Sequence, residues 1–519
     1  MAAGTRTVNG GGDVTDRLRG QARARPDHPA LVADGRTVTY GELDARVDAG
    51  AAVLQDRGIA PGDRVALIEG TTPAFVEAVL AIQRAGAVAV PLLPVLAPAE
   101  LAHVLEHSGS RCAIVGLDRA AAIDDLLATL PDLTDVIVTP GASRALPDRD
   151  QWADLVASSR TPAPVDRPAD GLAALVYTSG TTGWPRGAML TRANLTANQD
   201  QSLAGRFEID GDDVVLLTLP LAHIYALNVG LGATISVGAT AVLVERFDPS
   251  HTVGTIASTG VTVILGAPTM YQAWLESGAL DTTQFTGVRL AVSGAAPLPV
   301  PTIERFREVT GVMIEEGYGL TEASPSVTST AMLPAPVPGS VGLPLPDVEL
   351  RLVGDDGRVV EPGELGEVQL RGPNVFAGYW DDPEATEAAF TDDGYLRTRD
   401  VGVRDRDGLL RLVDRLDDVI VVHGFNVYPG EVERVLRADP TVAAAGVVGA
   451  SHPLTGETVI ASVVPRVGHQ IDVDQLHADC RSHLARYKCP TRIDVVTELP
   501  TTATGKLRRT ALRDLPPEP

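Results

Sequence analysis

Short apolar runs alternate with longer segments of helical spacing along the chain up to about residue 400. Each apolar run has the length of a buried strand, and each longer segment repeats its apolar positions at the spacing of an amphipathic helix. This alternation predicts parallel sheets covered by helices. The clearest strand–helix pairs are RVALIEG with TPAFVEAVLAIQRAG, VTVILGAP with TMYQAWLESG, and VRLAVSG with LPVPTIERFREVTG.

The sequence pattern changes near residue 345. There, VELRLVGDDGRVVEPGELGEVQLRG predicts β-hairpins with Asp-Gly and Pro-Gly turns. The charge cluster DRLDD then separates two apolar runs and predicts a domain boundary. We therefore expect an α/β protein. Its large N-terminal domain, residues 1–415, has helix-covered sheets, a β-rich subdomain and a loose tail at 1–12. Residues 416–519 form a small, mobile α+β domain.

The stretch from Val214 to Val244 has no charged residue unless His223 is protonated. Pro220, Asn228 and several Gly, Thr and Ser residues interrupt it, and no basic flank follows. These features favour a buried helix and strand over a membrane span. The N-terminal segment has no apolar core of a signal peptide.

Composition narrows the class of partner. The 519 residues are 44% apolar with a formal net charge of −24. Such a charge argues against a nucleic-acid partner and against an anionic membrane surface, since both require Lys and Arg to neutralise phosphates. The three cysteines, Cys112, Cys480 and Cys489, have neither metal-ligand nor disulfide spacing, which favours a reducing cytoplasm.

Lysine is nearly absent. Lys488 and Lys506 are the only two lysines among 43 basic residues. A lysine that persists against this bias is a candidate for a task that the planar guanidinium of arginine cannot perform.

Residues 177–190, YTSGTTGWPRGAML, follow an apolar run and combine three glycines with hydroxyl side chains. Glycines let backbone N–H groups turn toward an anion, and hydroxyls add donors, so the loop is suited to phosphate. It is not a Walker A loop, because Arg186 stands without the lysine of that motif. By itself such a loop can equally be a solvated turn. The phosphate-binding candidates are Thr178, Ser179, Gly180, Thr181, Thr182, Gly183 and Arg186.

This loop resembles the signature loop of the adenylate-forming superfamily, which includes acyl-CoA synthetases, luciferase and peptide-synthetase adenylation domains. Further matching motifs span most of the chain, and together they are highly specific. They are LPLAHIYAL, GYGLTEAS, GELGEVQLRG, YLRTRD, DRLDDVIVVHGFNVYPGEVE and TATGKLRR. The set is most similar to fatty-acyl-CoA synthetases.

The resemblance implies a two-step reaction. A carboxylate attacks the α-phosphate of ATP and releases pyrophosphate, and the acyl-AMP then reacts with the thiol of coenzyme A. Charge accumulates on the phosphoryl oxygens in transit, so Mg²⁺ and fixed cations are expected to carry most of the catalysis. The resemblance assigns Mg²⁺ to Glu322, the α-phosphate to Thr321, and the bridge between carboxylate and phosphate to Lys506.

Nucleoside and thiol contacts carry over in the same way. Tyr318 would stack on adenine, with Gly294, Ala295 and Ala296 as the opposite wall, and Gly319 is a further nucleotide-binding candidate. Asp400 would bind both ribose hydroxyls, Arg415 would bind the ribose or phosphate, and Gly424 would line the thiol tunnel. The small domain must serve both steps, and Asp417 occupies the family's hinge position. The chain departs from the family at Arg186, a usual lysine, and at Arg399 and Asp414, both usual glycines.

The acyl pocket is predicted from His223, Tyr225 and Val229, for which core packing is an equally good interpretation. An apolar or fatty acid fits, whereas its chain length and an aryl alternative stay open. We find no insertion typical of ligases that load carrier proteins, so coenzyme A is the expected acceptor, with a carrier thiol or an amine as alternatives. A homodimer and a catalytically inactive nucleotide-binding protein also remain open at this point.

Overall fold

The computed structural model describes residues 12–116, 119, 123, 125–139, 150–178, 184–278, 280–422, 425–452, 456–502 and 507–513. The chain divides into two compact units. The first unit holds residues 1–349 and 371–396, and the second holds residues 350–370 and 397–519. The domain boundary between residues 415 and 416 stays a prediction.

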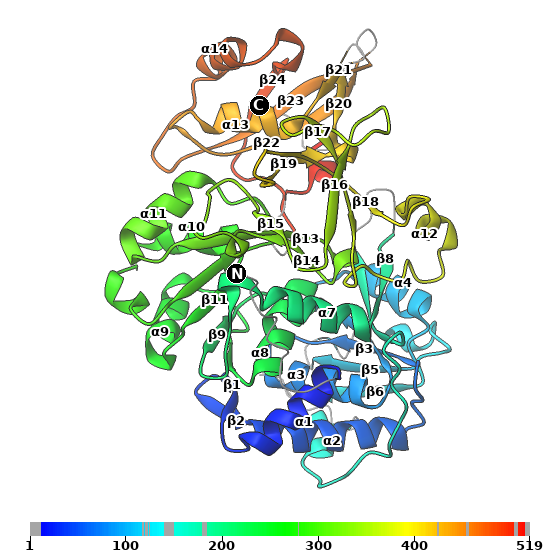
Figure 1. Ribbon diagram of the computed structural model, residues 1–519. Coiled ribbons are helices and arrows are strands. Elements are labelled where there is room, and N and C mark those ends of the chain that lie inside the picture. The colour runs from blue at the N-terminus through cyan, green and yellow to red at the C-terminus, as the bar shows by residue number, and fades with distance from the viewer. Residues whose placement is uncertain are drawn as a thin grey trace. The chain divides into compact units, whose positions relative to one another are not determined.

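Two largely parallel sheets form the first unit (Figure 1). In the larger sheet the six strands from β13 to β1 pair parallel, and antiparallel strands close both edges. In sheet order its strands are β15 (Leu343–Pro344), β14 (Ser326–Ser329), β13 (Ile314–Gly319), β12 (Leu290–Ser293), β11 (Val263–Gly266), β9 (Val214–Leu217), β10 (Thr240–Leu243), β1 (Pro29–Ala33) and β2 (Arg36–Thr39).

The second sheet of this unit is parallel except at its edge, where β7 and β8 are antiparallel. Its strands are buried apolar runs such as RVALI, which is the composition expected when helices cover both faces. In sheet order they are β6 (Asp135–Thr139), β5 (Cys112–Gly116), β3 (Arg64–Ile68), β4 (Val88–Leu92), β7 (Leu172–Thr178) and β8 (Arg186–Thr191).

Helix starts follow local capping rules. Thr72 caps α3 with proline at its first position, and Asp248 does the same for α9. The helices are α1 (Val14–Ala24), α2 (Tyr40–Asp56), α3 (Pro73–Arg84), α4 (Pro98–Ser108), α6 (Trp152–Val156), α7 (Arg192–Ser202), α8 (Ala233–Val237), α9 (Pro249–Thr259), α10 (Pro268–Ser277), α11 (Val300–Thr310) and α12 (Pro383–Ala389). Short helical turns are η1 (Gly205–Phe207), η3 (Thr282–Phe285), η4 (Thr321–Ala323) and η5 (Thr330–Met332), and η2 (Tyr225–Gly232) is π-helical.

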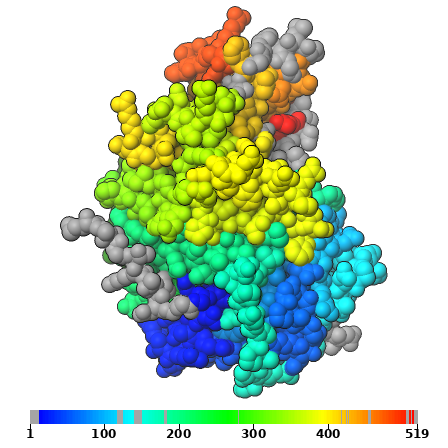
Figure 2. Space-filling view, turned by 45° about the vertical axis from the view of Figure 1, so that its right-hand side comes forward, coloured from blue at the N-terminus to red at the C-terminus, as the bar shows by residue number. Residues whose placement is uncertain are grey.

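The uncharged stretch from Val214 to Val244 forms β9, η2, α8 and β10, so the prediction of buried helix and strand is confirmed. No helix in the described part of the chain is long and apolar enough to cross a membrane. Helices α7 and α8 contact each other (Figure 1). Helix α7 also contacts β8 of one sheet, and α8 contacts β10 of the other. The segment from α1 to β6, blue to cyan, gathers in one area of the surface in Figure 2.

The second unit is built on sheets that are antiparallel except where β24 pairs parallel with β23. A four-stranded sheet has the order β16 (Glu349–Val353), β17 (Leu365–Arg371), β18 (Leu396–Arg404), β19 (Leu410–Arg415). A second sheet has β21 (Phe425–Val427), β20 (Ile420–Val422), β23 (Gly456–Pro465), β22 (Val442–His452) and β24 (Arg492–Val495), with helices α13 (Pro429–Arg437), α14 (Val473–His483) and α15 (Arg509–Arg513) and short turns η6 (Leu416–Asp418) and η7 (Arg486–Lys488).

Candidate active site

The Gly-rich loops of the first unit follow the carboxyl ends of its strands. β12 and β13 are parallel neighbours, with Ser293 opposite Glu316. Gly294, Ala295 and Ala296 therefore leave the sheet at the same edge as the segment that leads to Thr321 and Glu322. This edge is where open parallel sheets bind ligands. Ala295 has a φ of 70°, a left-handed backbone that an L-residue adopts at a cost.

Tyr225 lies against the first of these loops. A Cβ placed on Gly294 would come within 3.1 Å of Cε1 of Tyr225, so the aromatic ring touches the backbone there. A predicted acyl-pocket residue and a predicted nucleotide-site residue are thus in contact. The two halves of an acyl-adenylate must meet at one bond, which requires such a juxtaposition.

The other predicted acyl-pocket residues lie on or beside the same π-helical segment, a feature often found at functional sites. Val229 is buried within η2, and His223 precedes it with Nδ1 accepting a hydrogen bond from the Tyr225 N–H at 3.3 Å. Burial raises the pKa of Tyr225, so its hydroxyl stays protonated. Among the described residues neither the Tyr225 hydroxyl nor the buried Ser293 hydroxyl has a hydrogen-bond partner.

The turn that carries Thr321 and Glu322 is held by buried amides. Asn228 of η2 donates to the Ser324 carbonyl at 2.7 Å and accepts from Gln199 at 2.7 Å. Asn198 donates to the Ser326 carbonyl, and Asn374 donates to the carbonyls of Ala323 and Ser326. These buried amides were not predicted from sequence, because they contact the turn from distant parts of the chain.

Glu322 is half-buried, and one carboxylate oxygen accepts a hydrogen bond from the Tyr379 hydroxyl at 2.8 Å. The described residues contain no group of three or more His, Cys, Asp or Glu side chains able to hold a metal ion. Mg²⁺ is commonly bound by one or two carboxylates together with substrate phosphates. A single carboxylate at the nucleotide loops therefore fits a magnesium ion that arrives with ATP.

Arg186 begins β8, the strand that follows the phosphate loop. Its Nε lies 3.2 Å from a carboxylate oxygen of Asp382, and its guanidinium lies over the ring of Tyr379 at 5.7 Å. Thr178 ends β7, opposite Arg186 in the ladder. Tyr318 and Gly319 end β13, and Tyr318 is buried. The loop residues Ser179, Gly180, Thr181, Thr182 and Gly183 lie outside the described residues.

In the second unit, Asp400 and Arg415 are direct partners on β18 and β19. Arg415 donates from Nε to a carboxylate oxygen of Asp400 at 2.9 Å, so the two predicted ribose contacts orient one another. Arg399 has a φ of 60°. The glycine usual at this position is explained by that left-handed backbone, which Arg399 adopts with strain.

Asp414, the other departure from a usual glycine, is an anchor within the second unit. Its carboxylate accepts from the N–H groups of Gly430 at 2.5 Å and Arg415 at 2.9 Å, and Arg509 lies 3.9 Å away. Burial raises the pKa of Asp414 to about 6, against the lowering effect of Arg509 and of the backbone donors. The predicted hinge residue Asp417 lies in η6, the turn that directly follows the strand of Asp414.

The two lysines differ. Lys488 donates to Glu431 at 2.6 Å, an ion pair within the second unit that an arginine could also form, so this contact does not explain why the residue is a lysine. Lys506 and Gly424 lie outside the described residues; Thr501 and Leu507, on either side of the Lys506 segment, pair as an isolated bridge. The roles of Lys506, Gly424 and Asp417 stay predictions.

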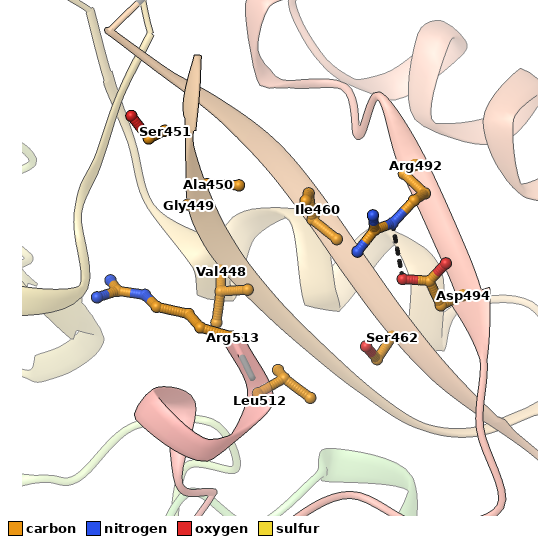
Figure 3. A pocket seen from close by; sticks show the side chains of 10 residues that line it. All are labelled: Val448, Gly449, Ala450, Ser451, Ile460, Ser462, Arg492, Asp494, Leu512 and Arg513. Atoms are coloured by element: carbon orange, nitrogen blue, oxygen red, sulfur yellow. Dashed lines mark hydrogen bonds and ion pairs between the residues drawn. The ribbon is translucent and has the colours of Figure 1, made fainter. Parts of the chain in front are cut away.

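A cavity of about 290 Å³ lies in the second unit beside β22, β23, β24 and α15 (Figure 3). Its walls include Ser462, Arg492, Asp494 and Arg513. Arg492 and Asp494 neutralise each other at 2.9 Å, as the dashed line in Figure 3 marks. We assign it no ligand.

Comparison with known proteins identifies the class. Residues 18–380 match the family of AMP-binding enzymes, and residues 431–506 match the AMP-binding enzyme C-terminal domain. The chain belongs to this family. The predicted α/β fold class with its smaller C-terminal domain is confirmed, and so is an AMP-forming ligase that activates an acid with ATP and transfers it to coenzyme A.

Individual relatives cover nearly the whole chain. Feruloyl-CoA synthase of an Amycolatopsis species is 37% identical over 495 residues, which are 95% of this chain and 97% of the relative. Long-chain-fatty-acid–CoA ligase of Yersinia pestis is 34% identical over 516 residues, 94% of this chain and 92% of the relative. The crystal structure of ATP-bound MatB from Rhodopseudomonas palustris matches with a TM-score of 0.88 and 33% identity, covering 97% of this chain and 98% of that one.

Proposed function

We propose that the acid activated by this ligase carries a hydrogen-bonding oxygen on an otherwise apolar body, as an oxygen-substituted aryl acid does. The observation that supports this class is the pair of buried hydroxyls, on Tyr225 and Ser293, that have no partner among the described residues. Burying an unpaired hydroxyl costs free energy, so such a group is expected to gain its partner from the substrate.

Apolar residues adjoin these two along the chain: Val229 is buried on η2, the segment that begins with Tyr225, and Val292 is buried next to Ser293 on β12. An apolar body with one polar group is the usual content of such a site. One relative is named for feruloyl, the acyl group of an oxygen-bearing aryl acid. Another is named for long-chain fatty acids, which are the competing class of substrate.

We propose that each part of the nucleotide is bound by a different set of residues. Thr321 binds the α-phosphate, and Tyr318 and Gly319 lie against adenine opposite Gly294, Ala295 and Ala296. Asp400 and Arg415 hold the ribose, and Lys506 bridges carboxylate and phosphate. Mg²⁺, when bound at Glu322 with the nucleotide, neutralises charge on the phosphates and so favours pyrophosphate as leaving group.

A panel of acids tests the substrate class. Pyrophosphate release is measured with a hydroxylated aryl acid, with the same acid lacking the hydroxyl, and with a long-chain fatty acid, each with and without coenzyme A. We expect kcat/KM for the hydroxylated acid to exceed that for its deoxy analogue by at least about tenfold, the worth of one good hydrogen bond.

Other outcomes separate the alternatives. Equal rates for the hydroxylated acid and its analogue, or faster turnover of the fatty acid, refute the proposal that the acid carries a hydrogen-bonding oxygen. Acid-dependent pyrophosphate release with no acyl-CoA formed points instead to transfer to a carrier-protein thiol or an amine. The assay is run in the cytoplasmic range of pH with Mg²⁺, and the oligomeric state is measured on the same preparation.

A further inference from the structure

Tyr379 belongs to a short segment that joins the two charged groups assigned to phosphate chemistry. Residues 377–380 run antiparallel to β8: Ala377 donates to the Met189 carbonyl, Met189 to that of Gly378, and Trp380 to that of Gly187. Tyr379 is therefore fixed beside the strand that begins with Arg186.

The same segment also holds Glu322. The Phe376 N–H donates to the Glu322 carbonyl at 2.8 Å, and the Tyr379 hydroxyl donates to a carboxylate oxygen of Glu322 at 2.8 Å. Residues 376–379 thus donate hydrogen bonds to both the backbone and the side chain of the proposed magnesium ligand. An ionised carboxylate only accepts, so the tyrosine is the donor.

The ring of Tyr379 is itself held in place. Phe376 packs edge-on against it with centroids 4.9 Å apart, and the Tyr379 N–H donates to the Thr386 hydroxyl at 2.9 Å. Gly378 has a φ of 128°, and a Cβ there would come within 2.6 Å of Thr386, so this turn requires glycine. The contact of Phe376 with the ring and the hydrogen bond of Thr386 with the backbone therefore fix the position of the Tyr379 hydroxyl.

We infer that Tyr379 is a positioning residue that orients the Glu322 carboxylate for the metal–nucleotide complex and seats the Arg186 guanidinium over its ring. The inference rests on the proposed role of Glu322. A hydrogen bond to one carboxylate oxygen fixes the rotation of the carboxylate, and the other oxygen is then oriented for the cation before the cation binds. A ring under Arg186 suits a planar guanidinium, which stacks on aromatic faces more readily than an ammonium.

The chain contains a matched control. Tyr395 donates from its hydroxyl to an oxygen of Glu349 at 2.8 Å, and the guanidinium of Arg371 lies 4.7 Å from its ring. Glu349 and Arg371 are exposed and Tyr395 is half-buried. The trio has the same chemistry as Tyr379, Glu322 and Arg186, and none of its members is a predicted site residue. Tyr395→Phe removes an equivalent hydroxyl away from the proposed site.

The test uses calorimetric binding of ATP by the full-length protein, with Mg²⁺ or with a chelator, so it needs no turnover. We expect Tyr379→Phe to weaken binding of ATP with Mg²⁺ by about tenfold or more, the usual effect of removing a group that orients a metal ligand. Binding of metal-free ATP and the midpoint of thermal unfolding are expected to match those of Tyr395→Phe, which behaves as the wild type.

A double substitution completes the design. On a Glu322→Gln background, Tyr379→Phe is expected to add no further loss of magnesium-dependent affinity, because the carboxylate it orients is gone. An equal loss with and without Mg²⁺, an undiminished affinity, or an additive loss in the double variant overturns the inference. Tyr379→Leu, which likewise offers no donor to the Glu322 carboxylate, replaces the phenylalanine variant if that one unfolds at lower temperature. Acid-dependent pyrophosphate release by the wild type tests the proposed function separately.

Discussion

Two buried tyrosines contact β12 or the residue that follows it. They differ in the partner of the hydroxyl, and that difference predicts opposite effects of the same substitution. The hydroxyl of Tyr225 has no partner among the described residues, whereas the hydroxyl of Tyr271 donates to the Val292 carbonyl at 2.8 Å. Both side chains are buried, at 9% and 0% exposure. Replacing each with phenylalanine removes one oxygen atom and keeps the ring.

The magnitudes follow from hydrogen-bond energetics. An unpaired buried hydroxyl carries a desolvation penalty of about 1–3 kcal/mol, which Tyr225→Phe removes. A satisfied hydrogen bond contributes about 1 kcal/mol net, which Tyr271→Phe loses. We therefore expect the ligand-free enzyme to gain about 1–3 kcal/mol of stability from the first substitution and to lose about 1 kcal/mol from the second.

Urea unfolding of the ligand-free protein measures both effects, provided that the slope of the transition is unchanged among variants. The kinetic assay with the hydroxylated acid and its deoxy analogue is then run on the same preparations. Tyr225→Phe is expected to lower kcat/KM for the hydroxylated acid to the level of the analogue, so that this variant is more stable and less selective.

A Tyr225→Phe variant that is no more stable than the wild type refutes the reasoning, since the hydroxyl then has a partner in solution, such as an ordered water. Greater stability with undiminished selectivity refutes only the substrate contact. A Tyr271→Phe variant that gains stability as well shows that the gain comes from the apolar surroundings rather than from the unpaired hydroxyl.

Three further predictions concern other parts of the chain. Lys506→Ala is expected to reduce acid-dependent pyrophosphate release by at least about 100-fold, while thioester formation from supplied acyl-AMP is spared; equal loss in both half-reactions contradicts this. Asp414 has a pKa of about 6 when folded against 3.8 for an ordinary aspartate. The folded state therefore binds more protons between pH 4 and 6, so stability falls as pH rises through that window and is level above it. The wild type is expected to lose about 3 kcal/mol of unfolding free energy on going from below pH 4 to pH 7, and Asp414→Asn is expected to show no such loss. Identical urea midpoints of the wild type from pH 4 to 7 would contradict this prediction. Asn228→Ala leaves three partners unsatisfied and is expected to cost about 3 kcal/mol, measured by the same unfolding.

The sheet edge at which the predicted nucleotide loops lie was predictable from short stretches of sequence. The loops at residues 294–296 and 318–322 follow strands whose apolar runs are legible by themselves, and parallel neighbours deliver their loops to one edge. The family resemblance also marked Arg399 as a departure from a usual glycine, and its left-handed backbone explains why glycine is usual there.

The residues that orient the site were not predictable in this way. Tyr379 lies 57 residues from Glu322, and no spacing within either segment indicates that they meet. Asn198 and Asn228 look like ordinary polar residues in helices until the packing of α7 and η2 places them beneath the turn at residues 321–326.

By itself the sequence predicted alternating strands and helices and the Gly-rich loops, because periodic burial and loop composition are local properties of the chain; the class of chemistry followed from the resemblance of its motifs to a known family. Only the tertiary structure decided which tyrosine hydroxyl meets a carboxylate, which meets a carbonyl and which meets nothing. Partnership of a buried polar group depends on how distant segments pack, and that packing is settled by the whole fold rather than by neighbours in sequence.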